Sequence, residues 1–270
     1  MAADETMGDV APDAAGWLLA VDLGGTRTRV ALVAAPLAAR AEVIATFPTE
    51  QRYADEIVRL AEALAEAQGQ ATGPVVGVGV ALGGRIARDG SGALVAPNLR
   101  DYEGRPFVQE IAARCGGLPT RLAHDAVCGL LAERRLGALI GAQRCAYLTL
   151  STGTGCAIHL EASGGAGVTV SIEMGHQLLD GNARVCLCGQ TGCLETWTGG
   201  KLLGMRYGQA IETLPAAEQF DLWRGFSEKL SLGLVNLVAL TRVERVAIGG
   251  AIALHHPELL DALRAGVAER

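Results

Sequence analysis

The sequence predicts an α/β fold made of two related halves. An apolar run from Trp17, the glycine pair Gly24-Gly25 and alternating apolar residues after Thr28 predict a strand, a tight turn and an antiparallel return strand. The same order returns in the second half of the chain, at 145–150, 151–155 and 157–160. Half of the residues are hydrophobic, 4% are aromatic and 36 are glycine, a composition that suits tightly packed layers of helices and strands.

Hydrophobic spacing predicts the other elements. Ile57, Leu60 and Leu64 recur at helical intervals within residues 52–68, and a second helical pattern covers residues 223–240. Shorter helices are expected at 107–113 and 126–136. Apolar runs predict further strands at 74–82, 120–123, 168–172 and 243–248.

Charge and composition exclude several classes of protein. The formal net charge is −6, so no basic surface for nucleic acid is expected. No apolar run is long enough to predict a membrane span. The first residues lack the basic and then apolar pattern of a secretory signal, so residues 1–15 are expected to be a flexible leader and the protein cytoplasmic.

Three of the seven cysteines crowd into one short segment. A secreted disulfide framework is the competing interpretation, but the odd count, the tight spacing and the missing signal favour a metal site. Cys186, Cys188 and Cys193, with His176 upstream, supply the four ligands of a closed tetrahedral zinc site. Four protein ligands leave no open position, so this zinc would be structural; chance clustering of reduced cysteines is the alternative.

The turn Asp22–Thr26 lies between two predicted strands, which excludes the dinucleotide fingerprint and the P-loop because both need a following helix. Its glycines let backbone N–H groups approach an anion, and Asp22 can hold water around a magnesium ion. An ordinary glycine hairpin is the alternative. A second such turn, Thr152-Gly153-Thr154-Gly155, favours the phosphate-binding interpretation.

Other polar residues have plainer explanations when each is taken alone. Asp125 lies at a predicted strand end before a helix, where an aspartate is usually an N-cap. Asn98 suits a turn, and Glu173 and Glu195 flank the cysteine segment as ordinary surface carboxylates.

Taken together, seven motifs occur in a fixed order between about Leu18 and Leu254: DLGGT, APNL, HDA, STGTG, ExGH, CxCGxxGCxE and IGGA. In this order they resemble the ROK family of repressors, open reading frames and sugar kinases. The combination of ExGH with CxCGxxGCxE is the most specific part. The resemblance implies an actin-like, ribonuclease-H-like fold of two lobes around a cleft, ATP with magnesium as cofactor, and transfer of the γ-phosphoryl group to a sugar hydroxyl.

The resemblance also implies roles for individual residues. Asp125 would be the general base for the 6-hydroxyl of the sugar, and His176 would bind zinc through one ring nitrogen and sugar through the other. The sugar hydroxyls would be held by Asn98, Asp125, Glu173, His176 and Glu195. The phosphates would contact Gly24, Gly25, Thr26, Thr152 and Gly153, and the adenosine would contact Gly249 and Gly250.

The chain departs from the family pattern at several positions. Arg27, His124 and Ser151 stand where the family usually has Lys, Asn and Gly. Family members usually continue after IGGA with further helices. These C-terminal helices are therefore expected to be missing from a chain that stops at Arg270.

The first hypothesis is an ATP-dependent hexose kinase, with glucose as the default substrate and a homodimer as the family implies. Its expected lobes are residues 16–123 and 124–270, with a zinc-binding segment at 173–195. The second hypothesis is a sugar-binding or regulatory ROK protein with weak or no kinase activity and no DNA-binding domain, since few residues precede the first strand. An actin or chaperone-type ATPase is a third, disfavoured by the zinc segment and the short length. The residues do not identify the sugar.

Overall fold

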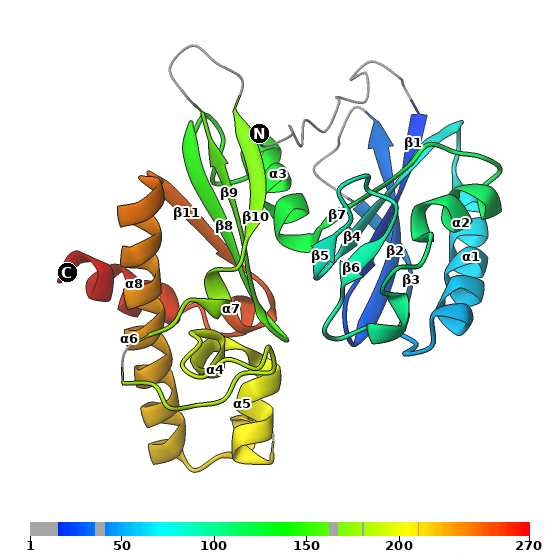
Figure 1. Cartoon of the computed structure of the whole chain (residues 1–270). Helices are drawn as coiled ribbons and strands as arrows, with labels where there is room; N and C mark the ends of the chain where they lie inside the picture. Colours follow the sequence, from blue (N-terminus) through cyan, green and yellow to red (C-terminus); the bar gives the residue numbers. More distant parts are fainter. Residues whose placement is uncertain (1–15, 36–40, 162–166, 180, 210) are drawn as a thin grey trace. The chain divides into compact units, whose positions relative to one another are not determined.

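The computed structural model describes residues 16–35, 41–161, 167–179, 181–209 and 211–270. The chain divides into two compact units (Figure 1), one ending at Cys128 and the other running Gly129–Arg270. This division falls within helix α3 (Asp125–Leu136), a few residues after the boundary expected between residues 123 and 124. The expected leader, residues 1–15, lies outside the described residues.

The first unit is built on a five-stranded sheet. Its strands are β1 (Gly16–Leu23), β2 (Arg27–Ala35), β3 (Ala41–Pro48), β4 (Val75–Leu82) and β7 (Thr120–His124). The order is β3-β2-β1-β4-β7, in which β2 is antiparallel to β1 and β3, whereas β4 is parallel to β1 and β7. The carboxyl ends of β1, β4 and β7 therefore meet at one edge of the sheet.

Two helices, α1 (Tyr53–Gln70) and α2 (Phe107–Arg114), pack side by side on one face of this sheet (Figure 1). α1 buries Ile57, Leu60 and Leu64, as their spacing predicts, in one core with the inward residues of the strands. The short pair β5 (Arg85–Ile86) and β6 (Ala93–Val95) and the 3-10 turn η1 (Arg100–Tyr102) complete the unit.

The second unit is built on a four-stranded sheet. Its strands are β8 (Arg144–Leu150), β9 (Thr154–Leu160), β10 (Val168–Ile172) and β11 (Arg245–Gly249). The order is β10-β9-β8-β11, with β9 antiparallel to both neighbours and β11 parallel to β8. The shorter elements are η2 (Met174–His176), α4 (Glu195–Thr198), α5 (Gly200–Tyr207), η3 (Ile211–Thr213) and α7 (Ala251–His255).

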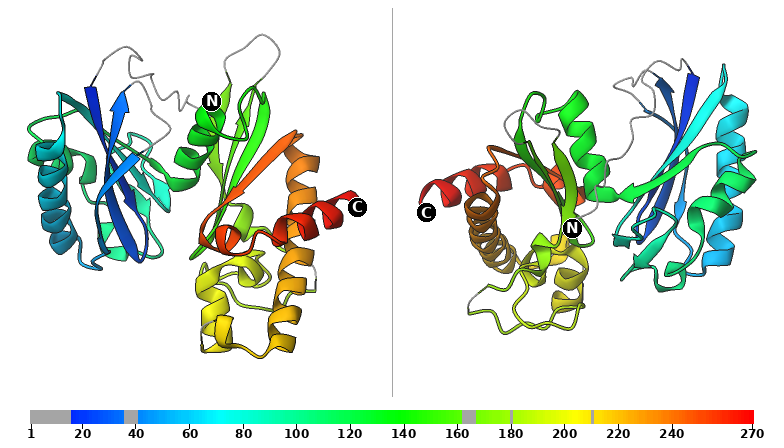
Figure 2. Two further views of the ribbon diagram at one scale, coloured as in Figure 1. Left: turned by 180° about the vertical axis from the view of Figure 1, so that it is seen from behind. Right: turned by 45° about the horizontal axis from the view of Figure 1, so that its top comes forward.

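A long helix, α6 (Ala216–Thr241), lies beside α8 (Leu259–Ala268) in this unit (Figures 1 and 2). Phe226 and Leu230 of α6 share a core with the apolar side chains of β8 and β9. Helix α6 begins before residue 223, where the apolar spacing placed its start. Apolar spacing detects buried turns, and the first turn of α6 is mostly exposed. No helix in the described ranges is both long and apolar enough to cross a membrane.

Both units share one strand plan, as the repeated sequence pattern predicts. In each, a strand turns back at glycine into an antiparallel neighbour, as in β1–β2 and β8–β9. The same strand then pairs in parallel with a strand further along the chain, β4 or β11. Each plan therefore leaves a glycine turn at the carboxyl end of its first strand.

Helix α6 offers a matched test of core packing in the second unit. Phe226 is 0% exposed and Phe220 on the same helix is 69% exposed. Phe226→Ala is expected to lower the free energy of unfolding by about 3–5 kcal/mol through lost burial and a cavity. Phe220→Ala should change it by less than about 0.5 kcal/mol. Denaturant unfolding followed by circular dichroism measures both, and equal losses would contradict this core assignment.

Candidate metal centre and ligand-binding turns

A histidine and three cysteines converge in the second unit. His176 ends η2, and Cys186, Cys188 and Cys193 lie in the loop before α4. The four ligand atoms all lie within 4.8 Å of one another. The Cys188 and Cys193 sulfurs are 3.6 Å apart, and the Cys186 sulfur is 3.8 Å from His176 Nδ1. The sequence-predicted metal ligands are thus brought together, and the cysteines are free thiols.

These distances can be compared with those of a tetrahedral zinc site. Bond lengths of about 2.3 Å for Zn–S and about 2.0–2.1 Å for Zn–N place two sulfurs about 3.8 Å apart, and a sulfur and a nitrogen about 3.6 Å apart. The observed spacings of 3.6 Å and 3.8 Å agree with this geometry. The donor set, three soft sulfurs and one imidazole, is also one that zinc prefers. The cluster is therefore consistent with a closed zinc site.

The loop that carries the cysteines is held by its backbone. Gly189 and Gly192 have φ of 91° and 98°, in the left-handed region that favours glycine, as the turn between the cysteines requires. The Cys186 amide donates to the Gln190 carbonyl at 2.8 Å. Asn182 donates to the Cys193 carbonyl at 3.1 Å and to the Thr196 hydroxyl at 2.9 Å, so it ties the loop to α4.

The three thiols differ in acidity before any metal is considered. Burial raises the pKa of Cys186 and raises that of Cys193 to about 12. Burial also acts on Cys188, but hydrogen bonds from Gln190 and from the neighbouring thiols outweigh it and lower its pKa to about 7. Because zinc binds thiolates, one ligand is ready to bind while two must lose protons as the ion enters.

The carboxylate of Glu195 lies against the second glycine turn. Glu195 Oε2 accepts a hydrogen bond from the Thr154 amide at 2.8 Å. A Cβ at Gly153 would lie 2.9 Å from the same oxygen, and one at Gly175 would lie 2.6 Å from the Thr154 carbonyl. Small residues therefore let the cysteine segment and the glycine turn approach each other closely.

The imidazole of His176 has its two nitrogens in different surroundings. Nδ1 faces the cysteines, whereas Nε2 lies 3.9 Å from Glu173 Oε2. The Glu173 side chain is 75% exposed. If Nδ1 binds a metal, Nε2 carries the hydrogen and can donate it to a ligand.

The other predicted residues of this unit gather around the carboxyl ends of β8 and β11. Gly249 lies in register with Thr149, and a Cβ at Gly250, where φ is 90°, would lie 2.4 Å from the Leu150 carbonyl. The Lys201 amide donates to the Thr152 carbonyl at 2.9 Å. The turn with Thr152 and Gly153 is therefore fixed between the two strands and the start of α5.

In the first unit, the predicted residues lie where the parallel strands end. Leu82 pairs with both Leu23 and His124, so the glycine turn after β1, Gly83 and Asp125 share one edge of the sheet. A Cβ at Gly83 would lie 3.3 Å from Asp125 Oδ2. Such an edge is where open α/β sheets usually bind ligands.

The first glycine turn, Asp22 to Thr26, is braced on two sides. A Cβ at Gly25 would lie 2.8 Å from the Asn98 Cβ, so these two predicted residues are in contact. On the other side, the Thr49 hydroxyl donates to the Gly24 carbonyl at 2.8 Å, and the Thr49 amide donates to the Thr26 carbonyl at 3.2 Å.

Asp125 is set up as a carboxylate. Its Oδ1 lies 2.6 Å from the Ala126 amide and 3.0 Å from His124 Nδ1. The Ala126 amide also lies 3.1 Å from His124 Nδ1, but its single hydrogen goes to the shorter contact with Asp125 Oδ1. We therefore assign a hydrogen to His124 Nδ1, which donates it to Asp125. Burial alone would raise the pKa of Asp125, but the hydrogen bonds from His124 and Ala126 lower it below its ordinary value.

Sequence reasoning missed the supporting roles of three residues, Arg29, His124 and Asn182. Arg29 forms an ion pair with Asp22 at 2.7 Å, His124 contacts Asp125, and Asn182 holds the cysteine loop. The Arg29 pair had a readable signal, because counting outward from the turn places Asp22 and Arg29 opposite each other across the hairpin. No sequence signal pointed to Asn182, since its hydrogen-bond partners depend on how the loop runs in the folded chain.

A family model described as the ROK family matches residues 18–270. This chain belongs to the ROK family. Its His/Cys cluster is typical of the ROK zinc site.

Relatives of the ROK chain include kinases and repressors. It is 33% identical over 181 residues to a glucokinase of Thermotoga maritima, in a match covering 66% of this chain and 56% of that protein. It is 26% identical over 216 residues to the xylose repressor of Bacillus subtilis, covering 73% of this chain and 53% of the repressor. The ROK chain thus matches just over half the length of these relatives.

The fold of the ROK chain is also that of solved ROK structures. A ROK family glucokinase from Streptomyces griseus, in complex with glucose and AMPPNP, superposes with a TM-score of 0.75 at 24% identity. The match covers 93% of this chain and 88% of that one. It confirms the expected two-lobe, actin-like α/β fold.

Asn182 provides a test of how the cysteine loop is held. Asn182→Ala removes bonds to the Cys193 carbonyl and the Thr196 hydroxyl, and should lower the free energy of unfolding by about 1–3 kcal/mol. Asn236→Ala is the control, since it removes one exposed hydrogen bond, to Gln177, and should cost less than about 1 kcal/mol. Chemical denaturation measures both; an Asn182 variant as stable as the control would show that these bonds do not hold the loop.

Proposed function

We propose that this ROK chain is an ATP-dependent sugar kinase that phosphorylates the 6-hydroxyl of a hexose, with glucose as the default substrate. The observation that carries the proposal is Asp125, which is held as a carboxylate at the end of β7. The first glycine turn lies at the same edge of the sheet. A base for a hydroxyl and a turn for phosphate are the two parts that the reaction needs.

The proposed chemistry follows from the loose transition state of phosphoryl transfer, in which catalysis depends mostly on alignment and charge stabilisation. Asp125 accepts a hydrogen bond from the 6-hydroxyl and takes its proton as the oxygen attacks the γ-phosphorus. The bond from that phosphorus to the β–γ bridging oxygen breaks, and ADP leaves with the electron pair. Its lowered pKa keeps it ionised at neutral pH, and His124 fixes the carboxylate in one orientation. Asp125 Oδ2 faces Gly83, which leaves room for a substrate oxygen.

The remaining residues divide into sugar and nucleotide contacts in the proposal. For the first unit, we propose that Asn98 and Asp125 bind sugar hydroxyls and that the backbone of Gly24, Gly25 and Thr26 binds nucleotide phosphates. For the second unit, we propose that Glu173, His176 and Glu195 bind sugar hydroxyls. In that unit the backbone of Thr152 and Gly153 would bind phosphates, and Gly249 and Gly250 would lie near adenosine. Magnesium bound with ATP neutralises charge on the phosphates, and Asp22 would hold its water shell.

Zinc has a structural role in this proposal. Held by His176, Cys186, Cys188 and Cys193, it would fix the tautomer of His176 so that Nε2–H points toward a sugar hydroxyl. The contact between Glu195 and Thr154 supports this role, because it links the segment after the cysteines to the second glycine turn. A cytoplasmic location remains a prediction from the sequence, and a homodimer remains a prediction from the family.

A second candidate is a sugar-binding regulatory protein with little or no turnover. The similarity to xylose repressors favours it, because these relatives match a large part of the chain. The two candidates share the sugar contacts and differ in whether the sugar hydroxyl that Asp125 would activate has a γ-phosphoryl group to attack. A coupled assay of ATP consumption over a panel of hexoses and N-acetylhexosamines separates them. Turnover supports the kinase; sugar-dependent stabilisation without turnover supports the regulator.

Asp125→Asn tests the base assignment. The amide cannot take a proton, so turnover should fall about a hundredfold to ten-thousandfold while sugar binding remains measurable. Asp55→Asn is the matched control, since Asp55 lies on α1 and pairs only with Arg52 in the described contacts. Coupled kinetics and calorimetric sugar titration give the two readouts. Undiminished turnover in the Asp125 variant would refute the assignment.

Cys193→Ser tests the zinc site. Loss of one thiolate should reduce bound zinc well below one ion per chain and weaken sugar binding about tenfold or more. Cys145→Ser is the control, because Cys145 is equally buried but belongs to the β8 core. Elemental analysis and sugar titration measure the outcome. Full zinc stoichiometry in the Cys193 variant would contradict the ligand set.

A further inference from the structure

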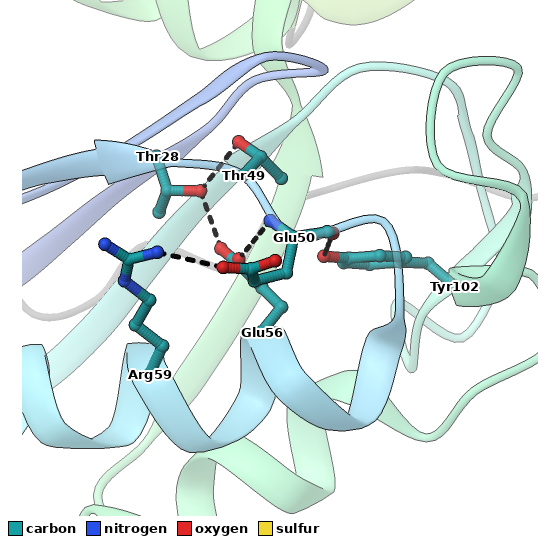
Figure 3. Close-up of polar contacts among 6 residues, drawn as sticks. All are labelled: Thr28, Thr49, Glu50, Glu56, Arg59 and Tyr102. Atoms are coloured by element: carbon teal, nitrogen blue, oxygen red, sulfur yellow. Dashed lines mark hydrogen bonds and ion pairs between the residues drawn. The ribbon is translucent and has the colours of Figure 1, made fainter.

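A buried carboxyl group lies beneath the first glycine turn. Glu56 of α1 is 0% exposed, and its Oε1 lies 2.6 Å from the Thr28 hydroxyl (Figure 3). Its Oε2 accepts from the Glu50 amide at 2.8 Å. The Thr28 hydroxyl in turn lies 2.9 Å from that of Thr49, which donates to the Gly24 carbonyl at 2.8 Å. Four groups thus form a continuous chain from Glu56 to the glycine turn.

Counting hydrogens gives this chain a direction. A carbonyl can only accept, so the single hydrogen of the Thr49 hydroxyl is used at Gly24. The contact between Thr28 and Thr49 must then use the hydrogen of Thr28. Nothing remains to join Thr28 to Glu56 unless Glu56 Oε1 carries a hydrogen itself.

An ionised Glu56 would leave one of the three contacts as two lone pairs facing each other in a buried place, which is costly. Among the described residues, no cation forms an ion pair with Glu56. Arg59 Nη1 pairs instead with Glu50 Oε1 at 2.9 Å (Figure 3). Burial raises the pKa of Glu56, in the direction that the hydrogen count requires.

We propose that Glu56 is a neutral carboxylic acid whose proton starts a one-way chain of hydrogen bonds through Thr28 and Thr49 to the Gly24 carbonyl. Glu56 is thereby a positioning residue for the first glycine turn. Only the link from that turn to ATP rests on the proposed function.

The chain fixes the peptide that a phosphate would meet. The Gly24 carbonyl is held by Thr49, and the Gly24 amide donates to the Arg27 carbonyl at 3.0 Å. In a planar trans peptide the N–H of Gly25 points opposite to the Gly24 carbonyl, and so away from the buried chain. Holding the carbonyl inward therefore presents the Gly25 N–H as a donor to an anion on the other side.

The charged and titratable groups that face Glu56 set its pH dependence. They are Glu50 after β3, Arg59 on α1 and Tyr102 on η1. Since the folded pKa of Glu56 is raised, its contribution to stability is complete below the ordinary pKa of about 4.3. That contribution is lost as the pH rises through the folded pKa.

The decisive variant is Glu56→Gln, because an amide reproduces the protonated acid: its NH₂ donates to Thr28 while its oxygen accepts from Glu50. Glu56→Leu removes the chain, and Glu62→Gln on the exposed face of α1 is the matched control. Wild type labelled with ¹³C at glutamate carboxyls should show one protonated carboxyl at neutral pH that is absent from Glu56→Gln. The absence of any such signal would overturn the proposal.

Two further readouts test the positioning role. Glu56→Gln should keep wild-type affinity for magnesium–AMPPNP and lose the fall in melting temperature that Glu56 causes at high pH. Glu56→Leu should bind about tenfold more weakly, the worth of a typical hydrogen bond. Equal effects of the Gln and Leu variants would overturn the proposal.

If wild type does not bind magnesium–AMPPNP, the proposed kinase function fails, and hydrogen exchange of the Gly24 amide decides the inference instead. Exchange that is faster in the Leu variant but not in the Gln variant supports the chain. Equal exchange in all three proteins would overturn it.

Discussion

The meeting of parallel strand ends at one sheet edge is the constraint on which the candidate site depends. In the first unit β1, β4 and β7 run in the same direction, so Asp22, Gly83 and Asp125 share an edge although they are far apart in sequence. In the second unit β8 and β11 do the same for the turn at Gly153 and for Gly249. Backbone direction, rather than any local motif, assembles each set.

The second unit adds a constraint of another kind, in which side chains fix a loop with little regular structure. Among its described residues, the cysteine loop has only isolated bridges, such as Leu178 with Cys193. Its shape depends on glycines in the left-handed region, on Asn182 and on the convergence of three sulfurs with His176. A bound zinc would supply the strongest of these restraints, since thiols are weak hydrogen-bonding groups and hold the loop only weakly by themselves.

Sequence reasoning succeeded where a few neighbouring residues determine the result. The convergence of Cys186, Cys188 and Cys193 could be predicted because glycines between them permit a tight turn. The contact of Glu195 with Thr154 was not, since it depends on how the fold returns the chain. Glu56 could be predicted only in part. It lies four residues before Leu60 on the buried face of α1, so helical spacing predicts a carboxyl group in the core. The spacing does not predict which residues that carboxyl group contacts.

The two glycine turns are each braced by a glutamate, with opposite consequences for charge. Glu195 touches the second turn through the Thr154 amide, where a carboxylate is the natural acceptor. Glu56 reaches the first turn only through two hydroxyls. A fully buried negative charge beneath a turn proposed to bind phosphate would repel the ligand, because little solvent would screen it, whereas Glu195 is only half-buried. A neutral acid gives the same hydrogen-bonded support without that repulsion, which is a physical reason for a glutamate in the core to keep its proton.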